Sequence, residues 1–283
     1  MNWLRKVTVP VKLAVVLLAF LGVGLASCAT DAVSPTDLNR GFQQMYNLDF
    51  GAAHATFGAF QQQHPEDPMG HASNAAAYLF SEFDRLQILE SDLFTDDRKF
   101  DSRSRLTPDP AVKAEFESEV AKSTDLANKI LQQDSHDKNA LFALVLANGL
   151  RGDYAAMIEK RNLASLAYMK TSRGMAERLL AIDPTCYDAY LAIGVENYLL
   201  GSTSAPVRWV LRMTGSQTDK DEGVQRLRLT AEKGAYLAPF ARLLLAVAAL
   251  RDKDRQTARI LLASLATEFP RNQLYAKELA RIQ

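Results

Sequence analysis

Few residues of this 283-residue chain have the types and spacing that chemistry needs. Its two cysteines and four histidines are Cys28, Cys186, His54, His64, His71 and His136. No histidine lies near Cys186 in the sequence, which favours a structural residue over a nucleophile. His64 and His71 flank the turn PEDPMG, at a separation that matches no established metal-ligand motif. We therefore expect His64 and His71 at the surface and no metal site.

The known sequence motifs of catalysis are also missing. The chain has no nucleophile elbow, phosphate-binding loop, dinucleotide fingerprint or zinc-protease helix. Paired acids such as Asp96 and Asp97 lie in a charged stretch, where solvation is the simplest interpretation. We therefore predict a protein that is not an enzyme and that uses no cofactor.

The reactive residue with the clearest context is Cys28. Arg5, Lys6 and Lys12 precede an almost purely apolar run that ends in LASC at residues 25–28. A basic start, a short apolar core and small residues before a cleavage site are typical of a secretory signal. The apolar core is shorter than the roughly 20 residues that a membrane-spanning helix needs. We expect residues 1–27 to be a signal peptide, and a retained N-terminal anchor is the alternative.

The four residues LASC resemble the bacterial lipobox. This resemblance implies cleavage before Cys28 and diacylglycerol on its thiol. Since each buried methylene contributes about 0.8 kcal/mol, two or three acyl chains hold a protein firmly on a membrane. Ala29 rather than Asp follows the cysteine, which by the same resemblance implies the outer membrane, facing the periplasm. Residues 28–35 would then be a lipidated tether, and residues 36–283 the folded domain.

The charge balance excludes one class of partner. The whole chain has 33 basic and 33 acidic residues. The predicted leader holds three basic residues and no acidic one, so residues 28–283 carry a small net negative charge. Binding to nucleic acid independent of sequence needs a concentrated positive surface. We therefore expect no nucleic-acid partner.

The residues beyond 36 have an all-helical pattern. Alanine, leucine and charged residues dominate, and glycine and proline fall between blocks with helical periodicity. We expect about five helix pairs and a C-terminal capping helix at 272–282, with Lys277, Glu278 and Arg281 facing water. The predicted pairs are 36–47 with 50–63, 70–90 with 110–133, 138–150 with 153–181, 186–200 with 220–233, and 239–250 with 254–267.

Small and large apolar residues recur at one spacing within these blocks. Ala53, Phe57, Phe60 and Pro65 have the same spacing as Ala258, Leu262, Leu265 and Pro270. Gly41 and Ala246 each precede the first alanine of a block by twelve residues, and Gly194 has a matching place. Small residues let paired helices approach closely, and proline ends the second helix of a pair.

This pattern resembles the tetratricopeptide repeat. The resemblance implies an all-α fold of stacked helical hairpins, a solenoid, over most of residues 36–272. Residues from about 190 to 282 are similar to bacterial tetratricopeptide proteins related to a eukaryotic group of the same class. A generic helical bundle with accidental spacing is the alternative.

Two segments interrupt the repeats. Residues 91–110 mix charges with Phe94 and Phe100 and end in two prolines, which fits a connection or a partner-binding loop equally. Residues 201–219 contain a short amphipathic pattern from Pro206 to Met213. It fits core packing best, with groove lining or membrane contact as the alternatives.

The expected function follows from the anchor and the repeats. Helical solenoids expose a concave face that commonly binds extended peptides. Polar residues of the first helices are the candidate groove contacts, namely Asn74, Tyr78, Asn148, Glu196, Asn197 and Tyr198. We expect a lipid-anchored scaffold that binds an unknown envelope protein or peptide. The alternative is a solute-binding lipoprotein with a polar cavity, comparable to the T-component partners of TRAP transporters.

Overall fold

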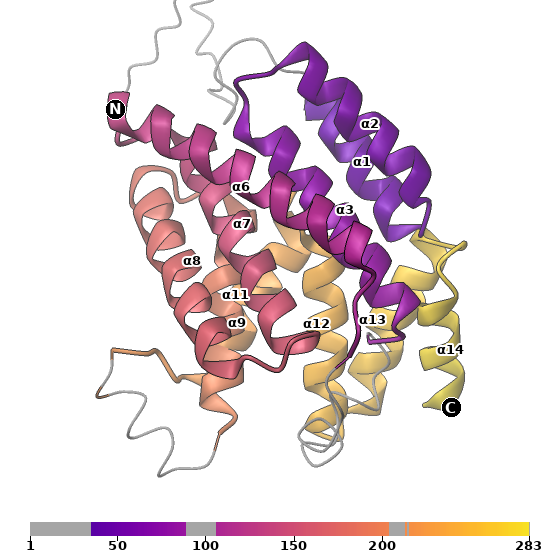
Figure 1. The fold of residues 1–283 in the computed structure, drawn as a ribbon. Coiled ribbons are helices and arrows are strands. Elements are labelled where there is room, and N and C mark those ends of the chain that lie inside the picture. The colour runs from indigo at the N-terminus through magenta and orange to yellow at the C-terminus, as the bar shows by residue number, and fades with distance from the viewer. Residues whose placement is uncertain (1–34, 89–105, 204–212, 214, 283) are drawn as a thin grey trace, which may run out of the picture. The chain divides into compact units, whose positions relative to one another are not determined.

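The computed structural model describes residues 35–88, 106–203, 213 and 215–282. The chain divides into two compact units, Met1–Val33 and Ser34–Gln283, and every described residue belongs to the second. Within this part of the chain all regular structure is helical (Figure 1). The helices are α1 (Pro35–Tyr46), α2 (Phe50–Gln63), α3 (Pro68–Arg85), α6 (Pro110–Gln133), α7 (Lys138–Met157), α8 (Asn162–Ile182), the short 3₁₀ helix η1 (Tyr187–Ala189), α9 (Tyr190–Gly201), α11 (Lys220–Lys233), α12 (Ala238–Arg251), α13 (Arg255–Glu268) and α14 (Gln273–Arg281).

Local sequence signals set most of the helix starts. Aspartate or asparagine side chains accept a hydrogen bond from the first turn of seven helices. These caps are Asp49, Asp67, Asp109, Asp137, Asp219, Asp254 and Asn272. Pro68 and Pro110 follow their caps directly, where proline needs no hydrogen-bond partner. The predicted helix limits are therefore close to the observed ones.

One turn recurs after four of the helices. In the turns 64–67, 134–137, 183–186 and 269–272, the first residue donates its N–H to the last turn of the preceding helix. The fourth residue then donates its N–H to the carbonyl of the first, at 3.0–3.2 Å. The sequences of these turns are HPED, DSHD, DPTC and FPRN. The same backbone connection thus leads from α2, α6, α8 and α13 to the next element.

The recurring small and apolar residues are the inward-facing ones. Gly41 lies so close to α2 that an added Cβ would meet the Phe57 ring at 2.2 Å, and a Cβ on Gly194 would meet Leu227 at 3.0 Å. The same spacing recurs at Ser123, Ala127 and Ile130 of α6 and at Ser172, Ala176 and Leu179 of α8. In the four helices these residues are fully or almost fully buried, except Ile130, which is half-buried. The buried ones are Ala53, Phe57 and Phe60 of α2, Ser123 and Ala127 of α6, Ser172, Ala176 and Leu179 of α8, and Ala258, Leu262 and Leu265 of α13, with Ala246 of α12 also buried.

Successive helices pack against each other, and the two ends of this unit also meet. Most of the closest helix pairs are neighbours in the sequence, such as α7 with α8 and α12 with α13. In addition, Asn272 donates its side-chain amide to the Tyr46 carbonyl at 2.9 Å. Arg271 pairs with Asp49 at 2.7 Å. The Tyr46 hydroxyl donates to the Tyr236 carbonyl at 3.1 Å. The C-terminal helices therefore hold the first helix pair.

Two predictions about the helices are wrong. The predicted break at 151–152 does not exist, because α7 continues to Met157 and Gly152 packs there against the start of α8, with the Ser165 carbonyl 3.6 Å from an added Cβ. Glu278 does not face water. It is buried within α14 and pairs with Arg281 at 2.9 Å, while Lys277 and Arg281 are exposed.

Several predictions fall outside the described residues. They concern the signal peptide, Cys28 and the tether, most of the segment 91–110, and the amphipathic pattern within 201–219. Among the helices that the structure describes, none is long and apolar enough to cross a membrane.

Candidate functional site

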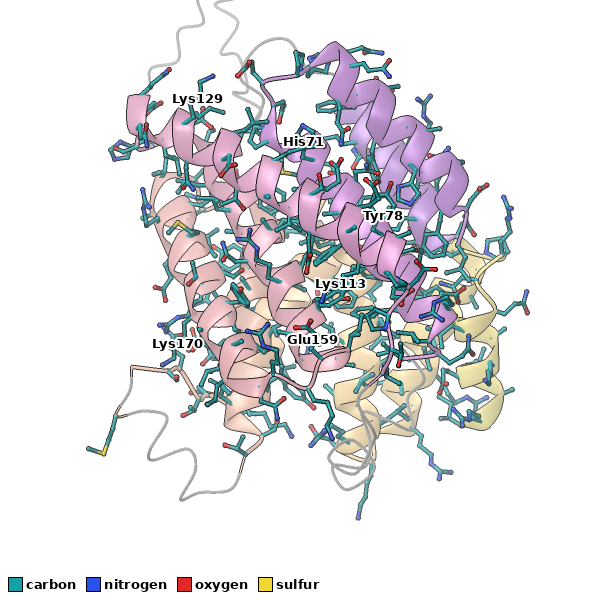
Figure 2. The ribbon with its side chains drawn as sticks, in the orientation of Figure 1. His71, Tyr78, Lys113, Lys129, Glu159 and Lys170 are labelled. Atoms are coloured by element: carbon teal, nitrogen blue, oxygen red, sulfur yellow. The ribbon has the colours of Figure 1, made fainter. Side chains whose placement is uncertain are left out.

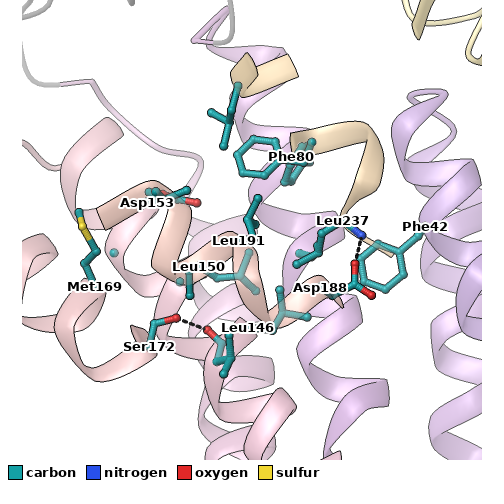
Figure 3. Close-up of a pocket in the computed structure, with 18 of the residues that line it drawn as sticks. Phe42, Phe80, Leu146, Leu150, Asp153, Met169, Ser172, Asp188, Leu191 and Leu237 are labelled. Atoms are coloured by element: carbon teal, nitrogen blue, oxygen red, sulfur yellow. Dashed lines mark hydrogen bonds between the residues drawn. The ribbon is translucent and has the colours of Figure 1, made fainter. Parts of the chain in front are cut away.

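A cavity of about 140 Å³, here called the central cavity, lies between α1, α3, α7, α8, α9 and α12. Its wall is mainly apolar, and much of it consists of Phe42, Phe80, Leu146, Leu150, Leu191 and Leu237. Figure 3 shows Asp153 and Met169 on one side of the cavity and Asp188 with Phe42 on the other. The first helices of the pairs converge here, so residues far apart in sequence form one site.

Three smaller cavities share walls with the central one. A cavity of about 70 Å³, here called the side cavity, shares Asp153, Phe240 and Leu244 with it. Another of about 70 Å³ shares Val195, Leu199 and Leu244, and one of about 110 Å³ shares Met45, Tyr46, Phe80 and Phe240. We refer to these four adjoining spaces together as the chamber.

Asp153 is the unusual residue of this chamber. It stands near the C-terminal end of α7, between the central and side cavities. In the part of the chain that the structure describes, no hydrogen bond or ion pair reaches its carboxyl group. Protein atoms surround the group, and this burial raises the pKa of Asp153 to about 7. The residue keeps a partly accessible surface because it faces the cavity itself.

Other buried carboxylates of the unit have partners. Asp188 lines the opposite side of the central cavity and accepts hydrogen bonds from the backbone N–H groups of Ala235, Tyr236 and Leu237, at 2.8–3.3 Å. Burial raises the pKa of Asp188, and these bonds partly offset the rise. Asp188 thus fixes the turn between α11 and α12 and has little capacity left for a ligand.

The carboxylates of Glu82 and Glu119 likewise accept hydrogen bonds from other residues of the protein. Glu82 accepts two bonds from Arg85 and one from the Asp109 N–H. Glu119 lies 2.7 Å from the His71 ring and accepts from Gln61 at 2.8 Å. Burial opposes ionisation of Glu119, but His71, Lys122 and Gln61 together lower its pKa. Both carboxylates therefore act as connections between α3 and α6.

The structure places most of the candidate groove residues in the interior. Asn148 donates to the Leu144 carbonyl of its own helix. Asn197 is fully buried, donates to Gln217 at 2.8 Å and accepts from the Asp219 N–H at 3.1 Å. These two asparagines fill hydrogen-bonding positions inside the protein, so they are not free to contact a peptide.

The remaining four candidates are also engaged with the protein. Glu196 is fully buried, 3.0 Å from Arg173, and burial raises its pKa while Arg173 lowers it. Tyr198 is buried and lines one of the 70 Å³ cavities. Asn74 is buried and pairs with His54 at 2.7 Å, and the half-buried Tyr78 lies over the same ring at 4.1 Å.

The prediction that His64 and His71 lie at the surface is wrong in part, since both are half-buried. His54, His64 and His71 are half-buried, because they fill positions between helices, whereas His136 is exposed. Cys186 is half-buried in the turn before η1 and forms no disulfide. Among the described residues, no group of three or more histidine, cysteine or acidic side chains could hold a metal ion.

A second hollow, of about 250 Å³, is polar and lies between α6, α7 and the start of α8. Its charges compensate one another, since Glu159 pairs with Lys113 at 2.9 Å, both labelled in Figure 2, and with Arg161 at 3.1 Å. These two cations lower the pKa of Glu159, although burial opposes the effect. The charged groups in the hollow are thus largely paired with each other.

Neither the chamber nor Asp153 as a site residue was predicted from the sequence. The predicted break at 151–152 places Asp153 at the start of a separate helix, 153–181, whereas it lies within α7. A single acid within a long apolar helix, LFALVLANGLRGDYAAM, was the available signal.

A comparison with protein-family models finds no match to this chain, and a comparison with curated proteins finds no significant similarity. The functional interpretation is therefore based on the geometry of the chamber. Apolar walls provide affinity for apolar surface, and the few polar groups of such a site provide orientation. The arrangement is suited to binding a small molecule.

Proposed function

We propose that this protein is a non-catalytic binding protein of the bacterial cell envelope that holds a small, mainly apolar molecule in the chamber. Of the two functions expected from the sequence, this is the solute-binding one, with an apolar chamber in place of a polar one. The observation that supports it is the central cavity with its apolar wall and its unpartnered carboxyl group. A role as an accessory to transport fits such binding.

The size of the chamber limits the ligand. An apolar cavity of about 150 Å³ stays dry and accepts a molecule as large as benzene. The central cavity has about this volume, and the cavities that share Phe240 with it lie at its borders. Burial of apolar surface contributes about 25 cal/mol per Å², so a compact apolar ligand gains most of its affinity from the wall.

The tetratricopeptide-like solenoid is part of this proposal. The recurring turn after α2, α6, α8 and α13 and the buried small residues at Gly41, Ala53 and Ala258 support it. A scaffold that binds a peptide in an open groove has less support, because five of the six candidate contact residues are buried. In the arrangement we propose, the faces of the first helices enclose a small molecule.

Anchoring through Cys28 is the second part of the proposal, and the LASC sequence after an apolar run supports it. A Cys28→Ala variant should keep its leader and lose lipid-dependent processing, and globomycin should have the same effect on the wild type. Metabolic labelling with a fatty-acid analogue and fractionation of the envelope measure this. Unchanged maturation in both cases would exclude the lipid anchor.

Ligand binding is tested by calorimetry with 2-phenylethanol as the probe. The purified full-length protein is placed in lipid nanodiscs, and empty nanodiscs are the blank. Ala192 lines the central cavity on α9, so Ala192→Phe fills part of the space. Ala280→Phe on the exposed face of α14 is the matched control.

We expect saturable binding by the wild type and by Ala280→Phe, and at least tenfold weaker binding by Ala192→Phe. Circular dichroism checks that both variants are folded. No binding by the wild type, or equal binding by a folded Ala192→Phe variant, would contradict the proposed function.

A further inference from the structure

The charges around the central cavity all have the same sign. Its ionisable wall residues are Tyr46, Asp153 and Asp188, and the side cavity adds none. Burial raises the pKa of Tyr46, so its hydroxyl stays neutral, and Asp188 is occupied by three backbone N–H groups. Asp153 is thus the only one of the three that can offer a negative charge to a ligand.

In the part of the chain that the structure describes, cationic side chains line the chamber only at its edges. Arg251 lines the 70 Å³ cavity beside Tyr198, and Lys277 lines the 110 Å³ cavity together with Asp84. Neither residue lines the central or the side cavity. Among the described residues, a ligand in those two spaces therefore meets two acidic groups, of which only Asp153 is available for pairing, and no basic group.

This charge pattern selects among apolar ligands. A carboxylate or phosphate ligand would place a second negative charge beside Asp153 in a poorly solvated space, which is unfavourable. An ammonium group would give Asp153 the partner that it lacks, and an ion pair with good geometry offsets the cost of removing both charges from water. A neutral ligand would leave the carboxyl group without a partner.

We propose that the ligand of the chamber is a hydrophobic amine, whose ammonium group pairs with the Asp153 carboxylate while its apolar body lies among Phe42, Phe80 and Phe240. This inference rests on the proposed function. Phe80 and Phe240 contact each other edge to face at 5.4 Å and both line the cavity. Aromatic faces also attract cations, so these rings suit an amine better than an anion.

Three probes of similar shape test the charge preference. They are 2-phenylethylamine, 2-phenylethanol and phenylacetate, titrated at pH 8 into the full-length protein in nanodiscs. We expect the amine to bind at least tenfold more tightly than the alcohol, and the anion to bind most weakly. An amine that binds no more tightly than the alcohol, or an anion that binds best, would overturn the inference.

A variant pair assigns the preference to Asp153. Asp153→Asn removes the charge at constant size, and Asp125→Asn makes the same change at an exposed position on α6. We expect Asp153→Asn to bind the amine and the alcohol with affinities within about twofold of each other, and Asp125→Asn to behave like the wild type. A full amine preference in Asp153→Asn would show that another group binds the cation.

The wild type alone provides an independent test through pH. Protonation of Asp153 below its pKa of about 7 removes the charge, whereas the amine stays protonated. We expect affinity for the amine to fall at least tenfold from pH 8 to pH 5 and affinity for the alcohol to change by less than about twofold. A pH-independent amine affinity would contradict the inference. If neither probe binds, the proposed function itself fails, whereas alcohol binding without amine preference overturns only this inference.

Discussion

Asp153 is an acidic residue whose carboxyl group has no partner among the described residues. Glu82, Glu119 and Asp188, by contrast, each accept several hydrogen bonds that link elements together. A carboxyl group with such partners stabilises the fold, whereas an unpartnered one in an apolar space costs free energy when it ionises. A ligand that pairs with the carboxyl group would remove this free-energy cost.

The cost of Asp153 in the ligand-free protein predicts a pH-dependent stability. Because its pKa is about 7 in the folded state and 3.8 in the reference state, the folded protein binds the proton more tightly. Stability from this group is therefore greatest at low pH and is lost as the pH rises toward and past 7. One pKa unit corresponds to about 1.4 kcal/mol. We therefore expect the free energy of unfolding of Asp153→Asn, relative to that of the wild type, to increase by roughly 2–3 kcal/mol from pH 5 to pH 8.

Urea unfolding of both proteins at several pH values measures this gain, and Asp125→Asn serves as the control. A constant difference between Asp153→Asn and the wild type across the pH range would show that Asp153 titrates normally.

At the scale of the elements, helix contacts depend on a few small residues. Gly41 faces the buried Phe57 ring with no room for a methyl group, whereas an added Cβ at Gly58 on α2 meets nothing within 4 Å. We expect Gly41→Ala to destabilise the protein by about 1–3 kcal/mol through overpacking, and Gly58→Ala to stabilise it by up to about 1 kcal/mol through helix propensity.

The free energies of unfolding of the two variants, measured under the same conditions, check this prediction. Equal effects of the two substitutions would mean that the close approach of α1 and α2 does not depend on Gly41.

These elements are also where the sequence is most informative. Aspartate caps, prolines after the caps and the recurring small residues predict most helix limits, because each acts within a few residues. The continuation of α7 through Gly152 and Asp153 depends instead on packing against α8. For the same reason the chamber could not be predicted, since its wall combines residues of six helices that meet only in the folded unit.

At the scale of the whole helical unit, the contact between its two ends is the main feature beyond nearest-neighbour packing. Asn272 both caps α14 and donates to the Tyr46 carbonyl at the end of α1. Tyr46 in turn lines the central cavity. The closure of the chamber on this side thus depends on a residue near the C-terminus.

This arrangement predicts a long-range effect of one substitution. Asn272→Ala should cost about 2–3 kcal/mol, since it removes a helix cap and a buried hydrogen bond. It should also raise amide hydrogen exchange in α1, far away in the sequence. Asp254→Ala, which removes only the cap of α13, should cost less and leave exchange in α1 unchanged. Equal exchange in α1 in both variants would mean that the contact between the ends contributes little.

The central claim is that the chamber holds an apolar molecule with a basic nitrogen. The most direct measurement is organic extraction of the tagged full-length protein, purified from its native envelope, followed by mass spectrometry of the extract. We predict a small hydrophobic amine in extracts of the wild type and of Ala280→Phe, and its loss from those of Ala192→Phe and Asp153→Asn. An extract without a specific molecule, or one whose bound molecule is anionic or persists in Ala192→Phe, would contradict the account.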